Sequence, residues 1–293
     1  MNRILLALMV ALGLCLASCD KEPGLDQSCL VVEGWIEDGG FPVVILTQSV
    51  PAFTKYKPQD VLKDYIVRWA WVAVTDGTDT VVLTGKYAPG YFPPFIYTTS
   101  RMRGQSGKSY TLIVKNGQMQ ATATTTIPAR PSNGTFKVEP CEDNDSLYQI
   151  IACFKDDPAT KNYYQFFTRV GLSTKQYLAS YLGSVDDAIL GPETRMPVYR
   201  GHHMTNDSYT PYYTLYDSVS VKFAQVDEAA YQFWDGYTKL LSLSGNLFLS
   251  SHSSLLTNID GGMGYWCGYG AITADIVIAD SVMAMPPAAG KRP

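Results

Sequence analysis

Residues 109–127 have the sequence SYTLIVKNGQMQATATTTI, which decides the fold class. Two runs rich in Thr, Val and Ile flank Asn116-Gly117, a dipeptide that favours a two-residue turn between antiparallel strands. Asp76-Gly77 gives the same signal between residues 65–75 and 78–87. Two hairpins within one short region predict a mostly β protein.

Further strand patterns surround these hairpins. Residues 29–37 alternate apolar and polar side chains and end at turn residues, and residues 43–49 form a second apolar run. Six or seven short strands over roughly 100 residues are typical of an immunoglobulin-like or fibronectin-like sandwich. We therefore expect a β-sandwich domain over residues 28–128.

Residues 129–134 predict a linker, because prolines at 128 and 131 disfavour continuation of a sheet or helix. A second β-rich domain is expected over residues 135–285, with a frayed tail over 286–293. One helix is expected near residues 227–242, where apolar and aromatic residues recur at helical spacing. The expected strands are 135–139, 147–154, 163–170, 175–182, the region of Val198, 216–223 and 271–282.

The N-terminus carries a targeting signal. Met1-Asn2-Arg3 supplies a basic start, and residues 4–17 form an apolar run shorter than the ~20 residues that span a bilayer. The closing Leu16-Ala17-Ser18-Cys19 resembles the lipobox of bacterial lipoproteins. That resemblance implies that residues 1–18 are a signal peptide and that Cys19 receives the lipid. An ordinary secretory signal is the alternative.

Such a lipid would hold the protein on a membrane, since two or more acyl chains give stable anchoring. Residues 19–27 then form the lipidated cysteine and a short charged tether. We expect an outer-membrane, lipid-anchored location, and the sequence leaves open whether it is the periplasmic or the cell-surface face.

Three segments together resemble one family. They are LVVEGWI at residues 30–36, Asp157-Pro158 followed by Asn162-Tyr163-Tyr164, and NIDGGMGY at residues 258–265. The chain resembles the uncharacterised Bacteroidota envelope lipoproteins known as domain of unknown function 4249. The resemblance implies a gene beside a TonB-dependent outer-membrane receptor, and so names such a receptor as a partner. It supplies no catalytic residues.

Composition narrows the function classes. Hydrophobic residues make up 46% of the chain and charged residues 17%, which indicates a folded globular protein. A net charge of −4 with no basic run argues against nucleic acid as a partner. Four cysteines follow the anchor, at 29, 141, 153 and 267, and they allow either disulfides in any of three pairings or buried free thiols.

No motif predicts catalysis, a metal or a cofactor. His202 and His203 could share a metal with Asp207 only from a loop, and the carboxylates of residues 142–145 lack the pattern of a calcium loop. The run Gly261-Gly262-Met263-Gly264 predicts a tight turn rather than a phosphate loop. Carboxylate pairs at 156–157 and 186–187 leave a glycosidase-type hydrolase as a less favoured alternative.

Two aromatic stretches are the candidate binding residues. Residues 87–97 and 209–216 crowd aromatic rings around prolines, which keep such segments out of sheet interiors. The candidates are Tyr91, Phe92, Phe95, Tyr97, Tyr209, Tyr212 and Tyr213. The alternative is that these rings cover the core. The sequence thus predicts a non-enzymatic lipoprotein that captures a ligand or assists a TonB-dependent receptor, with a structural or adhesive surface role as the alternative.

Overall fold

A computed structural model describes residues 28–49, 62–191, 193–201, 209–243 and 255–279. The predicted signal peptide, Cys19, the tether and the frayed tail lie outside these residues. So do His202, His203 and Asp207, which the sequence analysis considered as metal ligands.

The first half contains the two predicted hairpins. Antiparallel strands pair around Asp76-Gly77 and around Asn116-Gly117. The elements are β1 (Leu30–Glu37), β2 (Val43–Gln48), the 3-10 helix η1 (Leu62–Tyr65), β3 (Trp71–Thr75), β4 (Thr80–Val82), β5 (Thr84–Tyr87), β6 (Phe95–Thr98), β7 (Ser109–Asn116) and β8 (Met119–Thr126). A four-stranded sheet in the order β4-β3-β7-β8 packs against β1, β2 and β6.

The second half is also β-rich and carries the predicted helix. Its elements are β9 (Thr135–Cys141), β10 (Asn144–Phe154), β11 (Tyr163–Val170), β12 (Leu178–Asp186), the 3-10 helix η2 (Asp187–Ile189), β13 (Thr194–Val198), β14 (Tyr213–Thr214), β15 (Ser218–Val226), α3 (Glu228–Leu243) and β16 (Gly262–Val277). The helix begins where Asp227 accepts a hydrogen bond from the Ala230 amide at 2.9 Å. The mostly β fold class is confirmed.

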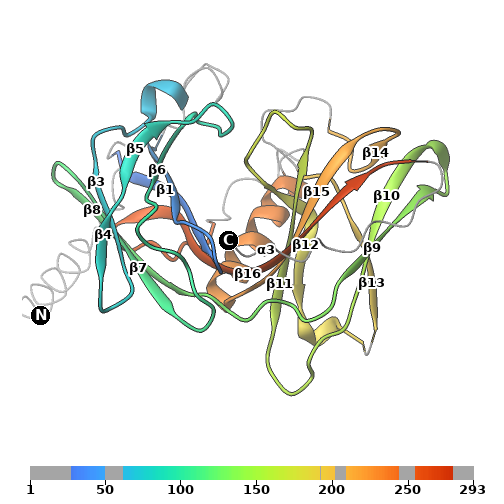
Figure 1. Cartoon of the computed structure of the whole chain (residues 1–293). Coiled ribbons are helices and arrows are strands. Elements are labelled where there is room, and N and C mark those ends of the chain that lie inside the picture. The colour runs from blue at the N-terminus through green and yellow to red at the C-terminus, as the bar shows by residue number, and fades with distance from the viewer. Residues whose placement is uncertain (1–27, 50–61, 192, 202–208, 244–254, 280–293) are drawn as a thin grey trace, which may run out of the picture.

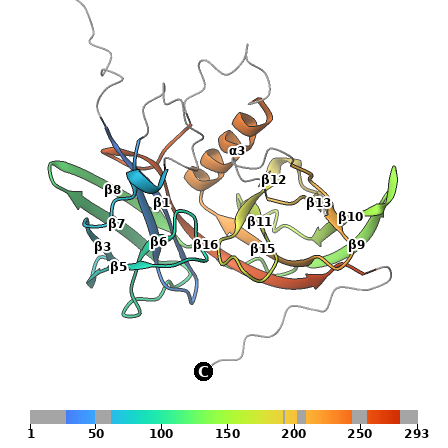
Figure 2. The same cartoon turned by 90° about the horizontal axis from the view of Figure 1, so that it is seen from above.

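Strand β16 joins the two halves. Its residues 262–269 run parallel to β1, and residues 270–277 run antiparallel to β15. One sheet in the order β12-β11-β15-β16-β1-β2-β6-β5 therefore crosses the whole molecule, as Figures 1 and 2 show. The predicted linker at 129–134 does not separate two independent sheets, because the chain returns to the first half after the helix.

The expected turn at residues 261–264 is also corrected. Gly261 makes a turn at a φ of 79°, but the glycines that follow belong to β16. At Gly264, with a φ of 104°, a Cβ atom would lie 1.9 Å from the Val32 carbonyl oxygen. Only glycine permits this approach of β16 to β1, so the final strand begins nine residues before the predicted start at Ala271.

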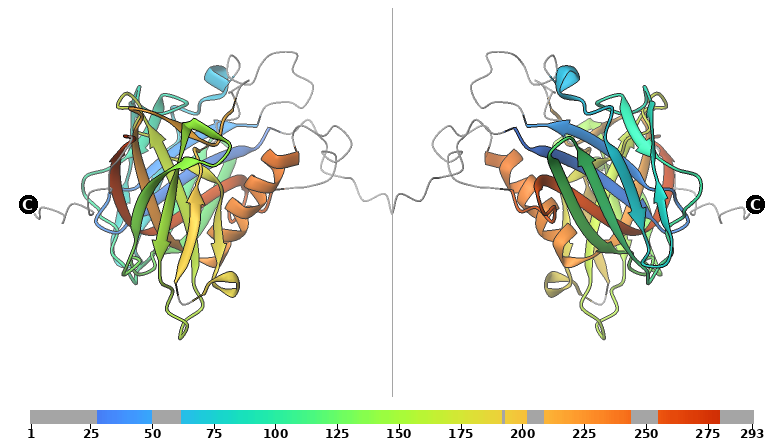
Figure 3. Two further views of the ribbon diagram at one scale, coloured as in Figure 1. Left: turned by 90° about the vertical axis from the view of Figure 1, so that its right-hand side faces the viewer. Right: turned by 90° about the vertical axis from the view of Figure 1, so that its left-hand side faces the viewer.

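The described residues form three apolar clusters in the interior. The first lies within the N-terminal sandwich and includes Trp266 of β16, whose indole N–H donates to the Tyr110 carbonyl at 2.9 Å. The second lies between the strands of the second half. The third lies where α3 covers the crossing sheet through Phe233 and Trp234. Figure 3 shows α3 on one flank of the molecule.

The cysteines at 29, 141, 153 and 267 are all free thiols, so of the two alternatives left open the structure has no disulfide among these four. Among the described residues, no helix has the length and apolar character needed to cross a bilayer.

Candidate functional site

The first aromatic stretch folds across onto the second half of the molecule. It forms the connection between β5 and β6 and meets the segment that links β11 to β12. The Lys175 amide donates to the Gly90 carbonyl at 2.8 Å, and the Phe92 amide donates to the Gln176 side-chain oxygen at 2.8 Å. The Gln176 amide group in turn donates to Glu33 Oε1 at 2.9 Å. One glutamine thus ties the aromatic connection to β1.

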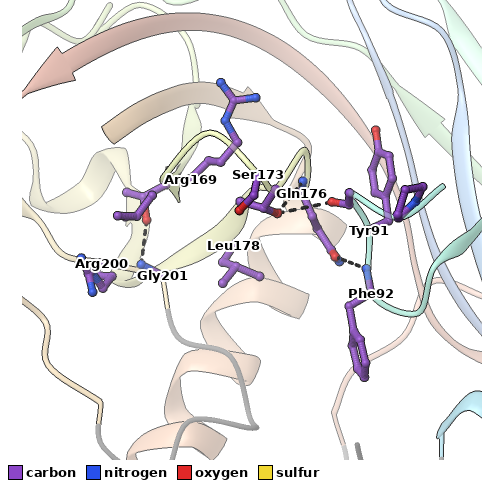
Figure 4. Close-up of a pocket in the computed structure, with 13 residues that line it drawn as sticks. Tyr91, Phe92, Arg169, Ser173, Gln176, Leu178, Arg200 and Gly201 are labelled. Atoms are coloured by element: carbon purple, nitrogen blue, oxygen red, sulfur yellow. Dashed lines mark hydrogen bonds between the residues drawn. The ribbon is translucent and has the colours of Figure 1, made fainter. Parts of the chain in front are cut away.

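A cavity of about 540 Å³ lies at this meeting point, and we call it the junction cavity. Figure 4 shows Tyr91 and Phe92 on one side, Arg200 and Gly201 on the other, and Ser173 and Leu178 between them. Its lining consists of residues 89–92, 168–170, Ser173, Thr174, Gln176, Leu178, Arg200 and Gly201. The walls combine aromatic and aliphatic surface with hydroxyl, amide and guanidinium donors.

A smaller cavity of about 230 Å³, the aromatic cavity, adjoins it, because Tyr91 lines both. Its lining is Trp35, Glu37, Tyr91, Phe167, Lys175, Tyr177, Lys222, Tyr265, Tyr269 and Thr273. Lys222 is buried, forms an ion pair with Glu37 and has its ammonium 4.2 Å from the centre of the Tyr177 ring. Such a cation–π contact helps to hold a buried cation.

The second aromatic stretch positions Arg200. The Arg200 amide donates to the Pro211 carbonyl at 2.9 Å, and the Arg200 carbonyl accepts from the Tyr209 hydroxyl at 2.6 Å. Its guanidinium forms an ion pair with Asp217 at 2.7 Å and lies 5.8 Å from the centre of the Tyr213 ring. Arg200 is therefore fixed at the edge of the junction cavity from both its backbone and its side chain.

The predicted aromatic residues have different places. Tyr91 and Phe92 line the junction cavity. Phe95 packs on the first core, and Tyr97 is only 1% exposed, with its hydroxyl donating to the Val67 carbonyl. Tyr213 is fully buried. Tyr97 and Tyr213 are buried and Phe95 is partly buried against the core, and none of the three lines either cavity.

Tyr209 and Tyr212 lie outside both cavity linings. Tyr209 supports Arg200 and packs edge-on against Tyr181, and Tyr212 packs edge-on against Tyr199. The two stretches therefore contribute to one place in different ways. The first supplies cavity wall, and the second orients a cation of that wall.

The sequence did not predict the polar residues of the cavities as a binding site, and Ser173 and Lys175 gave there only the spacing of a disfavoured catalytic pair. Arg169, Ser173, Thr174, Gln176 and Arg200 come from two strand ends and a connection, with no recurring spacing. The only local signal is the polar run Ser173-Thr174-Lys175-Gln176 within a region otherwise rich in strands.

Burial raises the pKa of several groups here, including Tyr265 and Tyr269 of the aromatic cavity. The pKa of Glu33 is raised because burial disfavours the charged carboxylate, while hydrogen bonds from Gln176 and Tyr265 act in the opposite direction. The pKa of Tyr91 is also raised, first by burial and then by the negative charge of Glu37. These groups therefore favour their neutral forms more than they would in water.

The carboxylate pairs meet elsewhere, around Asn162. Asp156 accepts from the Tyr164 hydroxyl at 2.6 Å and from the Asn162 side chain at 3.0 Å. Asp187 accepts from the Asn162 amide at 2.9 Å, and Lys161 forms ion pairs with Asp186 and Asp187. These aspartates line neither cavity. Within the described residues, no group of three His, Cys, Asp or Glu side chains is arranged to hold a metal ion.

Comparison with known families matches residues 19–273 to the model of a domain of unknown function, DUF4249. The chain belongs to the DUF4249 family. The match covers both halves, including the β1, β11 and β16 segments that carry the sequence resemblance. No curated protein matches this DUF4249 chain.

Proposed function

We propose that this protein is a lipid-anchored envelope protein that captures a small molecule in the junction cavity and works beside a TonB-dependent outer-membrane receptor. The observation that carries the proposal is the cavity itself. Segments far apart in the sequence, the β5–β6 connection and the β11–β12 segment, are hydrogen-bonded to each other and enclose one space.

The size and lining of the junction cavity support ligand binding. Small-molecule sites have volumes of roughly 300–1,000 Å³ and combine apolar walls with a few placed polar groups. The junction cavity is about 540 Å³ and has Tyr91, Phe92 and Leu178 beside Ser173 and Gln176. The hydrogen bonds of Gln176 also favour binding, because they hold the aromatic connection in place before a ligand binds.

Binding is favoured over hydrolysis by the state of the carboxylates. Asp156, Asp186 and Asp187 are engaged with Tyr164, Lys161 and the Asn162 backbone and side chain. Glu37, the carboxylate in the aromatic cavity, is paired with Lys222. A hydrolase of the two-carboxylate type needs an acid and a base facing a substrate.

The envelope location rests on the sequence. The lipobox-like Leu16-Ala17-Ser18-Cys19 supplies a lipid attachment point, and the family match begins at Cys19. Residues 19–27 can extend up to ~30 Å, so the folded part can lie close to the membrane and to a receptor in it.

Native mass spectrometry of protein released gently from its own envelope tests the capture. We expect a retained small molecule on the wild-type protein and its loss in the double variant Tyr91→Ala/Phe92→Ala, which removes one wall. Ser146→Trp, in the β9–β10 hairpin away from both linings, should retain it. Equal retention by the double variant, with the fold intact, would show that the ligand binds elsewhere.

The receptor partnership has a separate test. The lipidated protein, isolated in mild detergent, should co-purify with a TonB-dependent barrel in a fixed ratio, identified by mass spectrometry. Isolation of the protein as a lone monomer, under conditions that preserve other outer-membrane complexes, would contradict the receptor partnership. The ligand-capture part of the proposal would then depend on the mass-spectrometry test alone.

A further inference from the structure

The two adjoining cavities concentrate positive charge in an acidic protein. Arg169 and Arg200 line the junction cavity, and Lys175 and Lys222 line the aromatic cavity. Among the described residues that line either space, Glu37 is the one carboxylate, and it is paired with Lys222. The chain as a whole has a net charge of −4, so this cationic lining is a local feature.

Partners outside the linings neutralise these cations unequally. Arg200 is held by Asp217 at 2.7 Å. Arg169 reaches Asp275 only at 4.0 Å, and the Asp275 side chain is 87% exposed, so water screens that pair. Lys175 is exposed, and no ion pair is found for it among the residues that the structure describes. Positive charge therefore remains at Arg169 and Lys175.

Donors and rings surround this charge. Ser173 lies between the two cations in sequence and lines the junction cavity, and Tyr91 separates the two spaces. Tyr91 lies 6.3 Å from Trp35 between ring centres, which gives a wall of flat aromatic surface. A guanidinium and an ammonium beside hydroxyl donors suit carboxylate or phosphate oxygens, and the rings suit an apolar or cyclic group.

We infer that the ligand is an organic anion bound where the two cavities adjoin, with its carboxylate or phosphate at Arg169 of the junction cavity and Lys175 of the aromatic cavity, and its apolar part against Tyr91, which lines both. This inference rests on the proposed capture function and gives it a ligand class. It also predicts binding that weakens as salt rises, because partly exposed charges are screened.

Isothermal titration calorimetry of the lipidated protein in non-ionic detergent, with small molecules of defined charge, tests whether the ligand is an anion. Phenyl phosphate and 3-phenylpropionate should bind about tenfold or more tightly than neutral 3-phenylpropionamide, since a hydrogen bond to a charged group contributes on the order of one power of ten in affinity. Inorganic phosphate should bind more weakly than phenyl phosphate, because it lacks the apolar part.

The double variant Arg169→Gln/Lys175→Gln should lose the preference for the anions while still binding the neutral amide. Lys137→Gln, an exposed lysine of β9 outside both linings, should keep it. Equal binding of amide and acid, or anion binding unchanged in the double variant, overturns the anion class while leaving capture intact. Phosphate binding as tight as that of phenyl phosphate overturns the role of the rings.

If none of the probes binds, the charge of the molecule retained in native mass spectrometry tests the anion inference. An uncharged retained molecule overturns the anion inference and supports capture. The absence of any retained molecule counts against the capture function itself.

Discussion

At the residue scale, Gln176 and Glu33 connect the wall of the junction cavity to strand β1. The Gln176 side chain accepts from the Phe92 amide and donates to Glu33, so its two ends fix the aromatic connection to β1. Gln176 is buried, and a buried amide that loses a partner costs about 1–3 kcal/mol. The position of the cavity wall is thus coupled to one carboxyl group.

That carboxyl group gives the fold a pH dependence. The folded-state pKa of Glu33 is raised above its usual 4.5, so its contribution to stability is complete below about pH 4.5 and is lost as pH rises through the folded-state value. In Glu33→Gln this titration is absent. We therefore expect the free energy of unfolding of the wild type to fall relative to that of Glu33→Gln as pH rises from 4.5 to 8.

Urea denaturation at several pH values measures this difference. Glu142→Gln removes the same charge from the exposed β9–β10 hairpin and controls for the change in net charge. A constant gap between wild type and Glu33→Gln over the whole range would mean that the raised pKa of Glu33 is not a property of the folded protein.

The sequence predicted cavity residues where neighbouring residues give a local signal. Tyr91 and Phe92 stand out because prolines surround them, and both line the cavity. Arg169 and Arg200 carry no such signal, because their meeting depends on the pairing of β11 with β12 and on the second aromatic stretch. Tyr97 and Tyr213 look like Tyr91 in sequence, and only tertiary packing decides that they are buried.

At the element scale, β16 determines the architecture. Its first half needs glycine where it meets β1, since a side chain at Gly264 would overlap the Val32 carbonyl oxygen. The hairpins were predictable because Asp-Gly and Asn-Gly act within two residues. The early start of β16 was not predictable, because glycine is selected both in turns and where two backbones approach closely. The sequence alone does not distinguish these two causes.

Gly264→Ala should therefore destabilise the protein by more than about 4 kcal/mol or prevent folding, a loss typical of a severe steric defect. Gly77→Ala is the matched control, because Gly77 also has a positive φ, of 89°, but has nothing within 4 Å of an added Cβ. It should cost only about 1–2 kcal/mol, the backbone strain alone. Similar losses in urea denaturation would contradict the close approach of β16 to β1.

At the scale of the whole molecule, the two halves share one sheet and so should fold as one unit. Residues 28–134 expressed alone lack β16, and with it Trp266 and one of the two partner strands of β1. Loss of a buried Trp costs about 3–5 kcal/mol, a large part of the 5–15 kcal/mol that stabilises a typical domain. We expect this fragment to show poor amide dispersion by NMR and no cooperative unfolding.

Residues 28–293 should show native dispersion and a single transition. A fragment 28–134 with native-like dispersion would mean that the N-terminal sandwich is an independent domain, and that the crossing strand is an addition to it. The sequence indicates a boundary at 129–134 because prolines mark it, and the later return of the chain has no comparable local sign.

A crystal structure of protein purified from its native source tests most directly our proposal that the junction cavity holds a natural ligand. We expect electron density for a small molecule in the junction cavity, beside Tyr91 and Ser173, in the space that Figure 4 shows. Density for the co-purified molecule at another place, with solvent alone in the junction cavity, would contradict it.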